Sequence, residues 1–168
     1  MSPKSSRRRV PRLSHVDARG QVRMVDVSAK AETEREAVAE AVVRMGAAAL
    51  RAIRTKAVKK GDPLQTARLA GIMAAKNTAA LIPLCHSLAL SHVDVDLREE
   101  PKGYRLRSRV VTHGRTGVEM EALVAVTTAA LTLYDMLKAI DRAIVISSVR
   151  LLEKRGGRSG HYRAEGNR

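Results

Sequence analysis

The 168-residue sequence predicts an α+β fold in which an antiparallel sheet is covered by helices on one face. Two strand patterns joined by a short turn predict a β-hairpin within residues 88–112. Helical spacing of apolar residues precedes this hairpin and also follows it, within residues 117–141. The expected order is strand, helix, helix, strand, strand, helix, strand, and the length suits one domain.

The first three elements are predicted between residues 21 and 80. QVRMVDVS (21–28) alternates apolar and polar residues, which predicts a strand. From Thr33, the segment TEREAVAEAVVRMGAAALRAI is predicted to be a helix, because Thr33 and Glu36 match a capping box and apolar residues recur at helical spacing. Pro63 suits the first turn of a second helix that runs through Ala80.

The hairpin strands are LALSHVDVDL and YRLRSRVVT, with REEPKG as the turn between them. Three arginines on one face of the second strand are expected to pair with two aspartates across the hairpin: Arg105, Arg107, Arg109, Asp94 and Asp96. A metal site at His92, Asp94 and Asp96 is the alternative, although the arginines explain the carboxylates without a metal.

The last two elements are a long apolar helix within residues 117–141 and the segment AIVISSVRLLEK (143–154). The latter is apolar on both faces, which predicts a central strand of the sheet.

Composition excludes several classes of protein. A single cysteine cannot form an internal disulfide, which excludes a secreted disulfide scaffold. The N-terminus lacks the apolar core of a signal peptide, and the most apolar stretch, ALVAVTTAALTLYDML, is shorter than the roughly 20 residues of a membrane span. A cytoplasmic protein without a membrane partner is therefore expected.

Much of the net charge of +14 lies near the chain ends. Residues 1–12 are predicted to be a basic flexible arm and residues 163–168 a flexible tail, which leaves 13–162 as a single domain. The positive charge indicates a polyanionic partner, either nucleic acid or a phosphate-rich small molecule. Only three aromatic residues are present, which argues against stacking on nucleic acid bases.

The only cysteine, Cys85, stands beside His86 in the apolar stretch IPLCHSLALS. Sequence neighbours rarely serve as nucleophile and base, so residue type alone predicts Cys85 to be a packing residue. His86, at the edge of the apolar run, is the better candidate for a functional cleft.

Five other charged residues are candidates for chemistry: Asp135, Lys138, Glu119, Glu121 and Lys60. Asp135 and Lys138 are three apart on a helix that is otherwise apolar; a buried pair could transfer protons, whereas an exposed pair is a surface salt bridge. In one interpretation, Glu119 and Glu121 frame one site. In the other, Glu119 completes a capping box with Thr116 at a helix start. Lys60 precedes a helix start, where phosphate binds well.

Six segments together resemble the molybdenum cofactor biosynthesis protein C family of cyclic pyranopterin monophosphate synthases. They are MVDVSAKAETEREA, KGDPLQTARLAGIMAAKNT, LIPLCHSL, TGVEMEALVA, ALTLYDMLKAID and VRLLEKRGGRSG, in order across residues 13–162. The resemblance implies a ferredoxin-like fold and a lyase that converts 3',8-cyclo-7,8-dihydro-GTP to cyclic pyranopterin monophosphate with release of pyrophosphate. It also implies a homohexamer, a trimer of dimers with sites at the dimer interfaces. No cofactor would be required, although Mg²⁺ could accompany the triphosphate.

The resemblance also assigns roles to residues. The catalytic residues would be Asp135, Lys138 and Lys60, and the substrate-binding residues Leu84, Cys85, His86, Glu119, Met120, Glu121, Lys76 and Lys154. Three positions depart from the family pattern: Asn77, Ser87 and Arg158. A nucleic-acid-binding protein and a non-catalytic family member are the alternatives. GGRSG does not match a phosphate-binding P-loop, because it lacks the lysine and a following helix.

Overall fold

The computed structural model describes residues 19–165, so the expected arm at 1–12 and the end of the expected tail lie outside the described residues. Its elements are β1 (Thr33–Arg44), α1 (Ala47–Arg54), α2 (Pro63–Lys76), α3 (Thr78–Leu81), β2 (Leu90–Glu100), β3 (Gly103–Gly114), α4 (Glu119–Leu137), β4 (Val145–Arg155) and β5 (Tyr162–Arg163).

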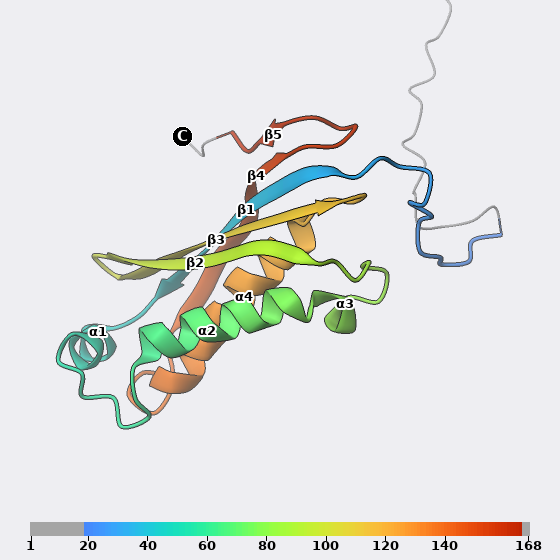
Figure 1. Ribbon diagram of the computed structural model, residues 1–168. Helices are drawn as coiled ribbons and strands as arrows, with labels where there is room; N and C mark the ends of the chain where they lie inside the picture. The colour runs from blue at the N-terminus through green and yellow to red at the C-terminus, as the bar shows by residue number, and fades with distance from the viewer. Residues whose placement is uncertain (1–18, 166–168) are drawn as a thin grey trace, which may run out of the picture.

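The sheet has the strand order β2-β3-β1-β4-β5, and every neighbouring pair is antiparallel. The long helices α2 and α4 lie side by side against one face of it (Figure 1). This confirms the α+β, ferredoxin-like arrangement with helices on one face. The predicted order of the longer elements is also correct from the first helix onward, and the short α3 and β5 were not predicted.

The placement of the first strand and first helix from sequence is wrong. Residues 21–28 form no strand apart from a single bridge residue, and the expected helix from Thr33 is instead β1, followed after a short turn by α1. Seven consecutive residues of β1, Ala37–Val43, are buried, because helices cover one face and long charged side chains the other. A strand buried on both faces has no period-2 pattern, so its apolar spacing resembles that of a helix.

Helix α2 begins as predicted, with Pro63 in its first turn. The carboxylate of Asp62 caps this helix by accepting hydrogen bonds from the backbone N–H of Leu64 (2.9 Å) and Gln65 (3.1 Å). The helix ends at Lys76 rather than Ala80, and the short α3 follows it.

Helix α4 is the core helix, with nine buried residues packed against α2 and the sheet. Its length and composition alone would allow it to cross a membrane, but half of its apolar window is buried inside the fold. The predicted capping box is wrong: Val118 is the N-cap residue, and no side chain caps the helix start. Glu119 is thereby free for another role.

The segment predicted to be a central strand, β4, lies near the edge of the sheet and has no fully buried residue. Its apolar run packs on the helices at one face only, and its outer edge pairs with just two residues of β5. The central strand is β1.

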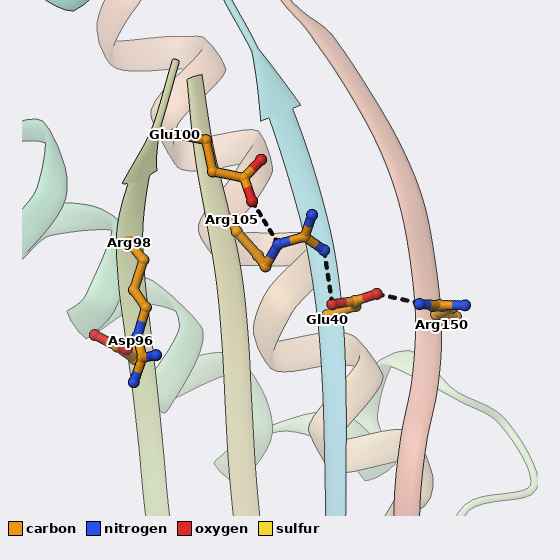
Figure 2. A network of polar contacts seen from close by, with 6 residues as sticks. All are labelled: Glu40, Asp96, Arg98, Glu100, Arg105 and Arg150. Atoms are coloured by element: carbon orange, nitrogen blue, oxygen red, sulfur yellow. Dashed lines mark hydrogen bonds and ion pairs between the residues drawn. The ribbon is translucent and has the colours of Figure 1, made fainter. Parts of the chain in front are cut away.

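The helix-free face of the sheet carries a charged network that crosses four strands (Figure 2). Arg105 of β3 contacts Glu100 of β2 (2.6 Å) and Glu40 of β1 (2.9 Å), and Arg150 of β4 contacts Glu40 (2.8 Å). Arg109 pairs with Glu36 of β1. Glutamates, rather than the expected aspartates, are therefore the partners of these arginines.

The expected placement of arginines across from aspartates is correct, since Asp94 lies opposite Arg109 and Asp96 opposite Arg107, although the turn is shorter than REEPKG. The expected ion pairs across it do not form, because Asp96 contacts Arg98 of its own strand (2.7 Å) and Arg109 turns to β1. Within residues 19–165, no group of three His, Cys, Asp or Glu side chains is placed to hold a metal, so the alternative at His92 finds no support.

Candidate functional site

Two adjoining cavities lie at the N-terminal end of α4. The first, which we call the His86 cavity, encloses about 450 Å³ and is lined by Val25, Val27, Lys30, Ile82, Leu84, Cys85, His86, Thr116, Gly117, Glu119, Met120 and Glu121. The second, the basic cavity, encloses about 690 Å³ and shares Lys30, Thr116, Gly117 and Glu119 with the first. Most of the residues expected to bind substrate are therefore brought together.

One wall of the His86 cavity is the extended segment before β1. The Nε2 atom of His86 lies 2.9 Å from the backbone carbonyl oxygen of Val25. Because a carbonyl only accepts hydrogen bonds, Nε2 carries a proton and donates it. The segment predicted as a strand at 21–28 thus packs against the site instead of joining the sheet.

The opposite wall holds Glu121, which is only 2% exposed. The Sγ atom of Cys85 donates to Oε1 of Glu121 at 3.5 Å, and Oε2 is buried without a hydrogen-bond partner among the described residues. Burial raises the pKa of Glu121. Burial, followed by the charge of Glu121, raises the pKa of Cys85 to about 11. Cys85 is half-buried at the cavity wall, not packed in the core, and its thiol stays protonated.

Glu119 lies where the two cavities meet. Its carboxylate folds back over Gly117, where a Cβ atom would come within 2.0 Å of Oε2 of Glu119. Glycine at position 117 leaves room for this placement of the carboxylate, and any larger residue would make the Glu119 side chain shift. Glu119 and Glu121 therefore belong to one site, as one of the two sequence interpretations predicted.

The basic cavity collects six cationic side chains against two carboxylates. The cations are Lys30, Arg35, Arg115, Lys154, Arg155 and Arg158. Of the carboxylates, Glu36 is already paired with Arg109. A concave surface with this excess of positive charge suits a polyanionic ligand such as a phosphate chain.

The turn between β4 and β5 is shaped around Arg35. Gly156 and Gly157 have φ of +90° and +74°, and a Cβ atom on Gly157 would lie 1.5 Å from Nη1 of Arg35. Arg35 Nε donates to the carbonyl of Gly114 (3.3 Å). No helix follows GGRSG, so this turn is not a P-loop, but it still forms a wall of the basic cavity.

Arg35, Lys30 and Arg115 were missed by the sequence interpretation. Arg35 was assigned to a helix that does not exist, which hid its position at the end of a strand beside the glycine turn. The available signal was the pair of glycines, which indicates that another group approaches the backbone closely.

The remaining catalytic candidates form a separate cluster at the C-terminal end of α4. Asp135 contacts Lys138 (2.8 Å) and Lys60 (3.0 Å), and Lys60 also donates to the backbone carbonyl of Asp135 (3.0 Å). The side chains of Asp135 and Lys138 are 56% and 52% exposed. The hydrogen bond from Lys138, then that from Lys60, lowers the pKa of Asp135, and Asp135 raises the pKa of Lys138.

Of the two interpretations of this pair, the structure of the single chain therefore shows the exposed ion pair rather than the buried one. Both pKa values move away from neutrality, so Asp135 and Lys138 are fully charged at pH 7 in this exposed setting. Lys60 precedes the start of α2 as predicted, but Asp62 caps that helix and the Lys60 side chain bonds Asp135.

A single chain does not unite the two groups of candidates. Glu119 and Asp135 are separated by almost the whole of α4, about 24 Å at 1.5 Å per residue.

Lys76 lies in neither cavity; it is exposed and lines a third hollow with His92. Of the three departures from the family pattern, Asn77 bonds the carbonyl of Met73 (2.8 Å), Ser87 is exposed, and Arg158 lines the basic cavity.

Comparison with known proteins agrees with this geometry. The MoaC family model matches residues 24–157, a range that includes the cavity wall before β1, the whole His86 cavity and all of the basic cavity except Arg158 and Ser159. A relative from Nostoc sp., named cyclic pyranopterin monophosphate synthase, is 57% identical over 152 residues, which cover 89% of this chain and 90% of the relative. The chain belongs to the MoaC family.

Proposed function

We propose that the chain catalyses the reaction for which its relative is named, a step of molybdenum cofactor biosynthesis. It is a lyase that converts 3',8-cyclo-7,8-dihydro-GTP to cyclic pyranopterin monophosphate and pyrophosphate. The observation that carries this proposal is the union of a carboxylate-lined cavity with a cationic one, which fits a ring system attached to a phosphate chain.

The substrate divides between the two cavities. The ring system lies in the His86 cavity, where Leu84, His86 and Met120 line the walls and Glu121 offers a buried carboxylate oxygen. The triphosphate extends into the basic cavity, where Lys154 and Arg35 neutralise its charge. Because pyrophosphate leaves as a polyanion, these cations stabilise the charge that develops on it.

Asp135, Lys138 and Lys60 transfer protons during the rearrangement. Since they lie about 24 Å from Glu119 along α4, a second copy of the chain must bring them to the cavities. This agrees with a homohexamer built as a trimer of dimers, with sites at the dimer interfaces. Contact with the second copy would also remove water from the exposed cluster and move both pKa values toward neutrality.

No resident cofactor is required. The basic cavity offers mainly cationic side chains, so any Mg²⁺ would arrive on the triphosphate rather than on a protein cage. Lys76, which is outside both cavities, would touch substrate only across a chain interface. The enzyme works in the cytoplasm, and its positive charge serves the triphosphate rather than nucleic acid.

Incubation of the purified protein with the cyclised GTP derivative tests this function. We expect pyrophosphate and pterin product to appear in equal amounts. A Glu121→Gln variant is the matched control, because it keeps the shape of the side chain and removes its charge. It should release neither product. Folded protein that releases neither product, and that instead binds RNA in a strongly salt-dependent way, would support the nucleic-acid-binding alternative.

A further inference from the structure

The chain's only cysteine contacts a deeply buried carboxylate of the His86 cavity. Cys85 Sγ lies 3.5 Å from Oε1 of Glu121, and the residues come from separate segments, 36 positions apart. Glu121 is only 2% exposed, yet Oε2 has no partner within residues 19–165. One oxygen of this carboxylate accepts from Cys85, while the other is buried without a hydrogen-bond partner, and Glu121 lines the His86 cavity.

A buried carboxylate with an unpartnered oxygen is costly unless a ligand donates to that oxygen. The Cys85 donor on the other oxygen also helps to fix which way the group faces. The thiol is suited to this task because its raised pKa, about 11, keeps the S–H proton in place throughout the neutral range.

We infer that Cys85 is a positioning residue: its S–H group holds Oε1 of Glu121 so that Oε2 is left as the acceptor for an N–H donor of the bound ring. The nature of that ring rests on the proposed function. A nucleophilic role does not fit a thiol that stays protonated, and a purely packing role does not fit a half-buried side chain that donates to a carboxylate.

Infrared spectroscopy tests the contact without any substrate. With one cysteine in the chain, the S–H stretching band comes from Cys85 alone. We expect the wild-type band at the lower frequency of a hydrogen-bonded thiol, and an upward shift in Glu121→Gln, whose amide oxygen is a weaker acceptor. Glu119→Gln is the matched control, because it removes the same charge next to the same cavity; its band should move far less. A free-thiol band in the wild type, or equal shifts in both variants, would overturn the inference.

Kinetics with the cyclised GTP derivative test the consequence. Cys85→Ala removes the donor, so we expect KM to rise roughly 10-fold with a smaller change in kcat. Burial raises the pKa of Glu121, while hydrogen bonds from its own backbone N–H and from Cys85 partly offset that rise, so loss of the Cys85 bond should raise the pKa further and move the acid limb of kcat/KM to higher pH. Cys85→Ser keeps a donor and should restore both.

Equal KM and equal pH profiles for Cys85→Ala and Cys85→Ser would contradict the positioning role. If the protein lacks synthase activity but the infrared band shifts as expected, the proposed function fails and the Cys85–Glu121 contact stands. Normal synthase activity without a band shift would overturn the positioning role and leave the proposed function intact.

Discussion

The Nζ atom of Lys60 lies 3.0 Å from Oδ2 of Asp135, although 75 residues separate them in the sequence. Lys138 occupies the other oxygen of the same carboxylate at 2.8 Å. The loop before α2 and the end of α4 thus build one charged cluster, well away from the two cavities at the start of α4. The cluster has acid and base groups, and none of its three residues lines the His86 cavity or the basic cavity.

The first prediction concerns this cluster. Asp135→Asn and Lys138→Ala should each lower product formation by roughly 10²-fold or more, as expected when a positioned acid or base is removed. Both side chains are about half exposed, so the variants should fold. Because the two residues would act as a unit, the double variant should be much less than additively worse. Steady-state release of pyrophosphate measures the effect.

A surface ion pair on another part of the molecule is the control. Arg54 and Glu99 are similarly exposed, and Arg54→Ala should leave turnover unchanged. Normal pyrophosphate release by folded Lys138→Ala would mean that the cluster is only another surface ion pair.

The second prediction concerns Gly157 and Arg35. In Gly157→Ala the new Cβ would meet Nη1 of Arg35 at 1.5 Å, so the guanidinium must leave its place in the basic cavity. We expect affinity for pyrophosphate, measured by calorimetry, to fall about 10-fold, as for the loss of one charge-assisted contact.

Gly160→Ala is the matched control for this substitution. Gly160 also has positive φ (+66°), but a Cβ there meets nothing within 4 Å. Both variants should lose about 1 kcal/mol of stability from the left-handed backbone, and only Gly157→Ala should lose affinity. An equal loss of affinity in the two would show that Arg35 does not bind the anion.

The third prediction concerns Glu40, which is 5% exposed between two arginines. Burial raises its pKa, but the hydrogen bonds from Arg150 and Arg105 outweigh burial, and the folded pKa lies below the usual 4.5. Glu40 therefore stabilises the fold above pH 4.5, and this contribution is lost as the pH falls through the folded pKa. Glu40→Gln should cost about 2 kcal/mol at pH 7 and much less at about pH 3.

Urea unfolding at the two pH values measures this difference. Glu32→Gln is the control, because its contact with Arg115 is exposed, and its effect should be small at both pH values. A Glu40→Gln penalty of the same size under acidic and neutral conditions would contradict the linkage.

Local patterns were sufficient to predict the elements that are buried on one face. The hairpin of β2 and β3 was predicted, with its arginines across from its aspartates, because its two faces differ in polarity. β1 was not, because Ala37–Val43 are buried on both sides and lack that difference. β4 was wrongly placed at the centre, since strand order depends on contacts far apart in the sequence.

The candidate site was also predicted only in part from the sequence. The motifs containing His86, Glu119 and Glu121 were recognisable, and the fold brings them into one cavity. The exposure of Asp135 and Lys138 was not predictable, because it depends on where α4 ends relative to its neighbours. Arg35 joins the basic cavity only through a turn that lies far later in the chain.

The central claim is that the cavities of one copy work with the Lys60–Asp135–Lys138 cluster of another. The most direct test combines two inactive variants, Glu121→Gln and Lys138→Ala, by co-expression, and measures pyrophosphate release by the purified mixture. Random pairing makes about half of the dimers hybrid, each with one intact site, so about a quarter of wild-type activity should return. A mixture of Asp135→Asn with Lys138→Ala, both damaged in the cluster, should stay inactive. Hybrids of Glu121→Gln and Lys138→Ala that form but release no pyrophosphate would contradict the account.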